Sequence, residues 1–344
     1  MAQKANLLKP NYYNNKFLEH EDAMMFRLSL PLMAKIFDLN PHGIFILLNI
    51  FNVFLLLLFL FLIHKHTKDK RVAFLFTLGV ASTYLGCCGF LDVQAGSVII
   101  MYTFLLLAIC FRNPIIILFC VLTAAWSDER ALLGSTLVYY WWIVIDNKFT
   151  FKSLLTKRLF NLSSISVVVA WAIYFLGRAY LVHAYGFRNS LINQQGIYIL
   201  FDVYNNLQLS LWSTFEGLWL LVLCLMVALI AKKDWVNALF ITGGLLFLFL
   251  AGVSNHDTTK SHLCMFLLLP IAVIYLHENL LASDLRKLIC ISSMVCILSP
   301  TVYIIKKVIY ASPIFQEGLL YIKVHNYEYI YPEEIKKMHR KLYH

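Results

Sequence analysis

The sequence has few charged residues for its size. Asp, Glu, Lys and Arg make up 14% of its 344 residues, hydrophobic residues make up 60%, and the mean hydropathy is +0.71. A typical soluble domain has about 45–50% apolar and about 25% charged residues. The scarcity of charge excludes an ordinary soluble enzyme and predicts an integral membrane protein that crosses the bilayer several times.

The cysteines lack the spacings that are typical of metal sites. No Cys-x-x-Cys pair and no Cys/His ligand pattern occurs, and most of the eight cysteines lie inside apolar runs. Buried free cysteine behaves as a small hydrophobic residue. The pattern therefore disfavours a zinc site or a disulfide framework for these positions: Cys87, Cys88, Cys110, Cys120, Cys224, Cys264, Cys290 and Cys296.

Long apolar runs are abundant, and they predict the fold. A helix needs about 20 apolar residues to cross ~30 Å of hydrocarbon. We therefore expect an all-α bundle with about ten transmembrane spans (nine to eleven), of which the fourth and fifth are short enough to form a shallow hairpin instead. The expected spans are 43–63, 72–90, 97–111, 114–126, 131–145, 161–182, 211–231, 235–253, 262–277 and 288–305. This predicts an N-terminal interfacial segment at 1–42, a membrane body at 43–306 and a short extracytoplasmic tail at 307–344.

The net charge of +10 is explained by an uneven distribution of Lys and Arg among the loops. If the loop after the first span is cytoplasmic, the inner loops carry thirteen Lys and Arg residues and the outer loops only four. Such a bias sets the orientation of membrane proteins. It removes the main support for a nucleic-acid partner and leaves membrane lipids as the expected surroundings. We expect a bacterial inner membrane, because the chain is compact and has no retention or sorting signal.

Carboxylates gather beside cations in three segments of the predicted outer face. These segments are EHEDAMMFR at 19–27, WSDERALL at 126–133 and SNHDTTKSH at 254–262. Acidic and basic groups at one membrane face suit a site that activates a nucleophile, or coordinates a metal, while it holds a phosphate. The alternative interpretation is that charged hairpin tips only keep the turns out of the lipid.

The first of these segments leads into an amphipathic stretch, HEDAMMFRLSLPLMAKIFDL at 20–39. Its apolar residues cover much of a helical surface, but Arg27 and Lys35 prevent a full span and Pro31 breaks or kinks a helix. We therefore expect an N-terminal amphipathic helix that lies in the membrane interface.

The order of these motifs resembles the GT-C superfamily of integral-membrane glycosyltransferases. The acidic stretch is followed by FRLSLPLMAKIF, then by an apolar body with an outer SDERALL hairpin, and then by a late outer HDTTKSH before a span with LLLP. The resemblance covers about residues 19–275. It implies transfer of a sugar from a polyprenyl-phosphate-linked donor to a glycan, lipid or protein acceptor at the extracytoplasmic face, as in building cell-envelope polysaccharide.

The resemblance also assigns roles to residues. Asp22 or Glu21 would be the catalytic base, with Glu19 as a substitute, and Asp128 and Glu129 would be a second acidic pair that positions the acceptor or a metal. The cations Arg27, Arg130 and Lys260 would hold the lipid phosphate. His256 and Asp257, from the late acidic motif, would complete the phosphate-binding side of the site. No cofactor is required, although the carboxylates would permit a divalent metal.

One feature departs from that family, and two other function classes stay open. Family members usually begin with a transmembrane helix, whereas residues 1–22 contain no apolar run and no signal-peptide hydrophobic region. A transporter or flippase of lipid-linked or polyanionic substrates would have charges near mid-membrane and internal repeats, and only Glu216 lies well inside a span. The other class is a different membrane transferase or polymerase, such as an acyltransferase or a polysaccharide polymerase.

Overall fold

The fold is taken from a computed structural model of the chain. It describes residues 4, 7–8, 25–91, 96–146, 161–187, 206–253, 257–299, 301–305 and 308–311. The predicted site residues Glu21, Asp22 and His256 lie outside this set, as do Glu19 and nearly all of the predicted tail.

The described chain is helical apart from one small hairpin, which confirms the predicted helical body. The helices are α3 (Ser29–Ile36), α4 (Pro41–Thr67), α5 (Lys70–Ala81), α6 (Tyr84–Leu91), α7 (Gly96–Cys110), α8 (Pro114–Ser127), α9 (Ala131–Asp146), α10 (Leu162–Tyr185), α12 (Leu207–Phe215), α13 (Trp219–Ala231), α14 (Trp235–Val253), α15 (Thr258–His262), α16 (Leu268–Asn279) and α17 (Ala282–Leu298). Short 3₁₀ turns, η5 (Glu216–Leu218) and η6 (Leu263–Met265), join α12 to α13 and α15 to α16.

The last expected span needs a correction. Helix α17 ends at Leu298, and the chain continues into strands β1 (Val302–Ile305) and β2 (Val308–Ala311), which pair antiparallel. Ile and Val are β-branched and favour extended backbone. The apolar run at 288–305 therefore contains a helix and then a strand.

Polar caps fix where several of the apolar helices begin. The Oδ1 atom of Asn40 accepts a hydrogen bond from the backbone of Gly43, and that of Asn113 accepts one from Ile115. In both helices proline follows the cap directly, at the first helical position. Proline suits that position because its missing N–H has no intrahelical partner there. The Asn-Pro pairs thus start α4 and α8 at defined residues.

Five described helical segments are long and apolar enough to cross a membrane. They are Pro41–Thr67, Leu162–Tyr185, Leu207–Ala231, Trp235–Val253 and Thr258–Asn279. The pair Lys70–Ala81 and Tyr84–Phe90 would be a sixth, but it is bent by 60°. These spans support an integral membrane protein. The predicted number of about ten is not confirmed, because helices α7, α8 and α9 have only 14 to 16 residues, about 22 Å at 1.5 Å per residue.

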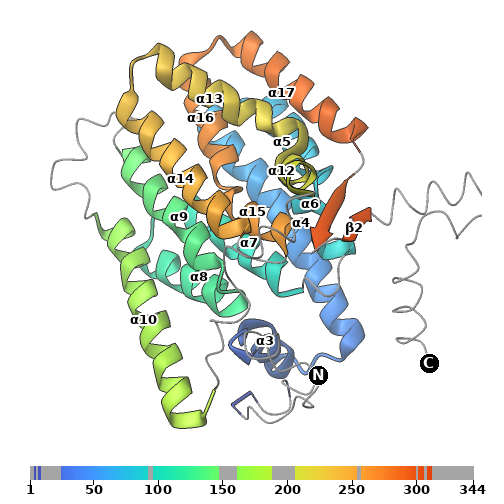
Figure 1. The fold of residues 1–344 in the computed structure, drawn as a ribbon, viewed down its shortest axis with the longest axis vertical. Coiled ribbons are helices and arrows are strands. Elements are labelled where there is room, and N and C mark those ends of the chain that lie inside the picture. The colour runs from blue at the N-terminus through green and yellow to red at the C-terminus, as the bar shows by residue number, and fades with distance from the viewer. Residues whose placement is uncertain are drawn as a thin grey trace, which may run out of the picture.

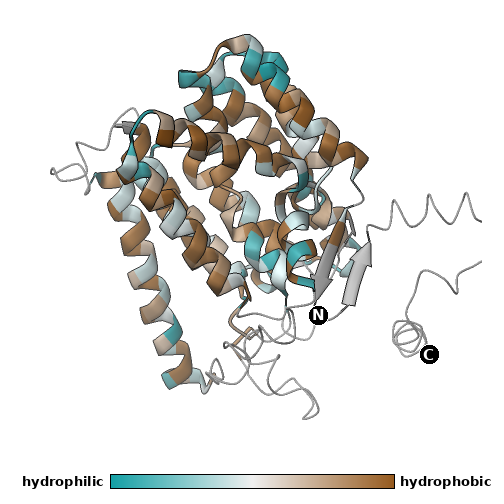
Figure 2. Cartoon of the chain, turned by 45° about the horizontal axis from the view of Figure 1, so that its top comes forward, coloured by the Kyte–Doolittle hydropathy of each residue, from teal (hydrophilic) through white to brown (hydrophobic). Residues whose placement is uncertain are grey.

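The spans pack as layers around a buried helix. Every residue in the apolar window of Thr258–Asn279 is buried, whereas α10 lies at the edge of the bundle in Figure 1 and exposes Phe175, Leu176 and Tyr180. Figure 2 shows hydrophobic colour over most of the bundle's helices, including those at its edge. An apolar surface of this kind suits contact with lipid.

Hydrogen bonds place the basic loops together at one end of the bundle. The Nζ atom of Lys65, near the end of α4, donates to the carbonyl oxygen of Cys110 at the end of α7, over 2.9 Å. The Nε atom of Arg286, at the start of α17, donates to Asp69 over 2.6 Å. We call this the basic end. Helix α8 starts there and runs away from it, so the turn between α8 and α9 lies at the opposite end.

Helix α3 packs against that opposite end. Ser29 and Ala34 are buried, and the Ser29 hydroxyl donates to the carbonyl oxygen of Thr123 in α8 over 2.8 Å. Leu32 and Ile36 of the same helix are 45% and 66% exposed. Pro31 lies in the first turn, where proline is tolerated, rather than at a break. The location of α3 in a membrane interface stays a prediction.

Candidate functional site

The site begins at the turn between α8 and α9, where Asp128 ends α8 in an extended conformation. Its carboxylate accepts a hydrogen bond from the backbone N–H of Arg130 over 3.1 Å, and its carbonyl oxygen accepts one from Ala131 over 3.0 Å. An aspartate that bonds to the backbone two residues on stabilises a tight turn. The Asp128 carboxylate therefore stabilises the turn and is also charged, so it can form ion pairs.

The same carboxylate forms a two-point ion pair with Arg130. The Nε atom of Arg130 lies 2.7 Å from Oδ1 of Asp128, and Nη2 lies 2.8 Å from Oδ2. Both side chains are buried, with 0% of Asp128 and 7% of Arg130 exposed. The paired, planar contact is the strongest geometry for an arginine and a carboxylate.

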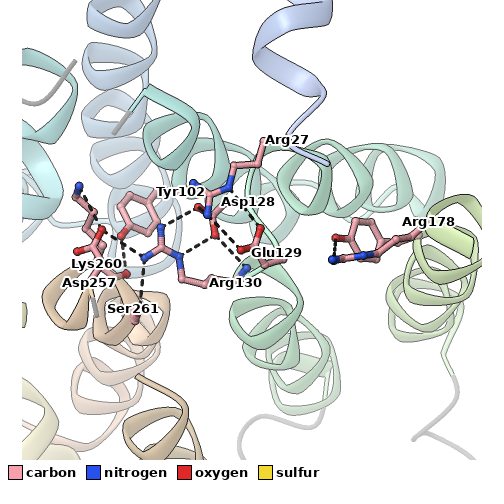
Figure 3. Close-up of polar contacts among 10 residues, drawn as sticks. Arg27, Tyr102, Asp128, Glu129, Arg130, Arg178, Asp257, Lys260 and Ser261 are labelled. Atoms are coloured by element: carbon pink, nitrogen blue, oxygen red, sulfur yellow. Dashed lines mark hydrogen bonds and ion pairs between the residues drawn. The ribbon is translucent and has the colours of Figure 1, made fainter. Parts of the chain in front are cut away.

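Arg27 joins this pair from the N-terminal segment. Its Nη2 atom lies 3.2 Å from the Asp128 carboxylate and 3.2 Å from that of Glu129. Its Nε atom also donates to Glu129, over 3.4 Å. Figure 3 shows the guanidinium between the two carboxylates. The segment before α3 is thus held onto the α8–α9 turn by charge.

The late segment reaches the same place from the start of α15. Arg130 Nη1 lies 3.8 Å from the carboxylate of Asp257 and donates to the Ser261 hydroxyl over 3.2 Å. Lys260 Nζ lies 3.3 Å from the same Asp257 oxygen. The Tyr102 hydroxyl on α7 donates to the Lys260 carbonyl oxygen over 3.0 Å. The residues lie side by side in Figure 3.

The structure therefore brings together six of the predicted site residues from three segments that are distant in sequence. We call them the six-charge network: Arg27, Asp128, Glu129, Arg130, Asp257 and Lys260. Two uncharged residues that form hydrogen bonds to the network, Tyr102 and Ser261, were not predicted from the sequence. Tyr102 lies in an apolar run in which nothing distinguishes it from a membrane-facing tyrosine. For Ser261, the only sequence signal of a role in the site is its position next to the predicted residue Lys260.

A third arginine, Arg178 on α10, lies near the network. The guanidinium of Arg178 lies 4.1 Å from the centre of the Phe26 ring, and its Nη1 donates to the Tyr174 hydroxyl over 3.1 Å. Stacking of a cation on an aromatic face is attractive. This contact joins α10 to Phe26 in the segment before α3.

Electrostatics keep the central groups ionised. Burial raises the pKa of Asp128, but the charges of Arg130 and Arg27 outweigh it, so the pKa lies below its usual value. Burial lowers the pKa of Arg27, but Asp128 and Glu129 more than offset this and raise it. A carboxylate with a lowered pKa is a weak base. Asp128 is thus better suited to hold the cations in place than to accept a proton.

The remaining carboxylates are easier to reach. The Glu129 and Asp257 side chains are 16% and 23% exposed, against 0% for Asp128. The Arg27 side chain is 17% exposed. These are the described groups that a ligand can contact without unpacking the core. Within the described residues no group of three or more His, Cys, Asp or Glu side chains is arranged to hold a metal ion. The sequence permits a divalent metal without requiring one, and that point stays untested.

Comparison with known proteins adds no assignment. No family model matches the chain, and neither a curated protein nor a solved structure matches it. The function is therefore argued from the six-charge network.

Proposed function

We propose that this protein is a membrane glycosyltransferase that moves a sugar from a polyprenyl-phosphate-linked donor to an acceptor hydroxyl. The observation that carries the proposal is the convergence of six charged side chains at one end of an apolar bundle. Charged side chains are costly to bury, and this network buries several of them. The turn between α8 and α9 uses Asp128, but it requires none of the other five charges.

The cations suit the leaving group of the reaction. As the bond between the anomeric carbon and the donor phosphate oxygen breaks, negative charge grows on the phosphate, which leaves as polyprenyl phosphate. Arg27 and Lys260 come from segments that are distant in the sequence, and each is held by a carboxylate. Cations that are already in place stabilise such charge without reorganisation.

The carboxylates suit the acceptor. The new bond forms between the acceptor oxygen and the anomeric carbon, and the acceptor proton passes to a base. Glu129 and Asp257 are the partly exposed described candidates. Asp22 and Glu21, which precede Arg27 by a few residues, stay the candidates that the family resemblance implies. Asp128 serves as a positioning residue for Arg27 and Arg130.

The apolar surface of the bundle suits the lipid part of the donor. A polyprenyl chain stays in the hydrocarbon layer, so its phosphate is delivered at a membrane face. The network lies at the end of the bundle opposite the basic end. By the positive-inside rule that end is extracytoplasmic, which agrees with the proposed direction of transfer.

A second candidate, a transporter or flippase, is favoured by Glu216. The span Leu207–Ala231 is interrupted at this residue, which has φ +49° and ψ −124° and is 1% exposed. Neither carboxyl oxygen has a hydrogen-bond partner among the described residues. Broken helices with ionisable groups are typical of transporter sites. The glycosyltransferase is preferred because the network contains more charges from more segments.

The test is transfer of labelled sugar from a polyprenyl-phosphate donor pool to membrane acceptors at matched expression. We expect Glu129→Gln and Asp257→Asn each to lower transfer at least tenfold, because both remove a reachable carboxylate from the network. Asp284→Asn is the matched control, since Asp284 is an exposed acid at the basic end, and it should retain full activity. Absence of transfer by the wild type, or full activity of both network variants, would contradict the proposal.

A further inference from the structure

The basic end contains a cavity that the proposed reaction does not use. Its volume is about 560 Å³, within the usual range for ligand sites. Two helix turns form it, the one between α4 and α5 and the one between α16 and α17. The lining residues are Thr67, Lys68, Asp69, Lys70, Arg71, His277, Ala282 and Arg286.

The cavity has a strong excess of positive charge. Four Lys and Arg side chains line it, and Asp69 is the one carboxylate among the lining residues. Asp69 is already engaged: it pairs with Arg286 over 2.6 Å and accepts the backbone N–H groups of Arg71 and Val72. No carboxylate of the described chain lies within ion-pair distance of Lys68, Lys70 or Arg71. Three cations therefore line the cavity without a fixed counter-charge from the part of the chain that the structure describes.

One lining residue, Lys68, has a left-handed backbone. Lys68 has φ +55°, in the left-handed region, and caps the end of α4. Glycine is the usual residue at such a position because it has no Cβ to clash. Lys233, outside the cavity lining, has φ +57°, so this conformation is not specific to the cavity.

Apolar side chains continue from the cavity along the outer surface of α5. Lys70, Phe74 and Leu78 are spaced four residues apart and so lie on one face of the helix. All three are exposed, Phe74 by 60% and Leu78 by 39%. Leu281, beside the cavity in the α16–α17 turn, is 72% exposed. A cation at the end of an apolar helical stripe matches the layout of a lipid, with its headgroup above its acyl chains.

We propose that this cavity binds a phosphate-bearing anion, namely the phosphate headgroup of an anionic membrane lipid. Lys68, Lys70 and Arg71 contact the phosphate, Arg286 is kept in place by Asp69, and the stripe from Phe74 to Leu78 contacts an acyl chain. Basic pockets between membrane helices bind lipid headgroups by this chemistry. The site lies at the opposite end of the bundle from the six-charge network and does not rest on the proposed function.

The test uses the purified full-length chain in a neutral detergent. The probes are dioleoyl phosphatidylglycerol, dioleoyl phosphatidylcholine and inorganic phosphate, and the readouts are native mass spectrometry and the shift in thermal unfolding. The double variant Lys70→Gln/Arg71→Gln removes two exposed cations from the cavity. The matched control, Lys232→Gln/Lys233→Gln, removes two cations from the same end but outside the lining.

We expect phosphatidylglycerol, and not phosphatidylcholine, to stay bound to the wild type and to raise its unfolding temperature. The cavity variant should bind phosphatidylglycerol about 25-fold more weakly, since each Lys or Arg near a membrane surface adds roughly fivefold, and the control should bind it normally. Protection by inorganic phosphate alone, lost in the cavity variant, would support the anion site and assign it a soluble ligand. The proposal would be overturned if the cavity and control variants lost equal affinity for phosphatidylglycerol. It would also be overturned if neither phosphatidylglycerol nor inorganic phosphate bound better than phosphatidylcholine.

Discussion

Replacement of Arg130 by methionine tests whether the six-charge network is held together as the structure describes. Methionine keeps much of the side-chain volume but removes the guanidinium, which makes two short contacts with Asp128 and one with Ser261. Asp128 is 0% exposed, so its charge would remain buried. Removing one partner of a buried pair costs roughly 3–5 kcal/mol.

The structure places the expected loss at the lower end of that range. In the variant Asp128 still has Arg27 at 3.2 Å and is not left without a counter-charge. We therefore expect Arg130→Met to lower the free energy of unfolding by about 3 kcal/mol. The measurement is unfolding by a denaturing detergent, followed by tryptophan fluorescence.

A double-mutant cycle separates the ion pair from packing. Asp128→Asn/Arg130→Met removes both charges at once, so no carboxylate is left buried with too few partners. We expect the double variant to be more stable than Arg130→Met alone, with a coupling energy of about 1–3 kcal/mol. Simple addition of the two single losses, or a loss below about 1 kcal/mol for Arg130→Met, would refute the reasoning.

Three further predictions follow from individual sites. The arginine partners of Asp128 lower its pKa. The stabilisation from this carboxylate is therefore complete above pH ~4, the usual aspartate pKa, and is lost as the pH falls through the pKa of the folded state. Because Arg130→Met removes one of these arginines, acid titration of the variant should show unfolding that begins at a higher pH than in the wild type. Glu216→Gln should keep or raise the free energy of unfolding, because no described group bonds to the carboxyl oxygens, and a loss above about 2 kcal/mol would reveal a partner. Gly217→Ala should destabilise the chain by about 1–3 kcal/mol, because the added Cβ would lie 2.3 Å from a backbone carbonyl oxygen of α17, whereas Gly243→Ala, with open space around it, should be neutral in the same unfolding assay.

The sequence was a good guide to where the charges gather. Apolar runs predicted most of the helices, and the contrast between basic and acidic loops predicted which turns share an end of the bundle. The contacts of Arg27 and Asp257 with the α8–α9 turn follow from that pattern, because segments at one end of a narrow bundle lie close together.

Other features depend on packing that a linear pattern does not contain. Hydropathy does not distinguish a short apolar helix such as α8 from a full span, and the apolar stretch from Val302 to Ile305 is compatible with either a helix or a strand. The role of Tyr102 depends on the approach of α15 to α7, a contact between segments 158 residues apart. The strained backbone at Glu216 has no local sequence signal either.

The most direct test of the central claim is the release of free polyprenyl phosphate from a polyprenyl-phosphate-linked sugar donor by the purified protein, measured by mass spectrometry with an acceptor present. The account predicts release and sugar transfer in equal amounts by the wild type, and at least a tenfold loss of both in Asp257→Asn. Release that is undiminished in Asp257→Asn, or a wild type that neither releases the lipid nor transfers the sugar, would contradict it.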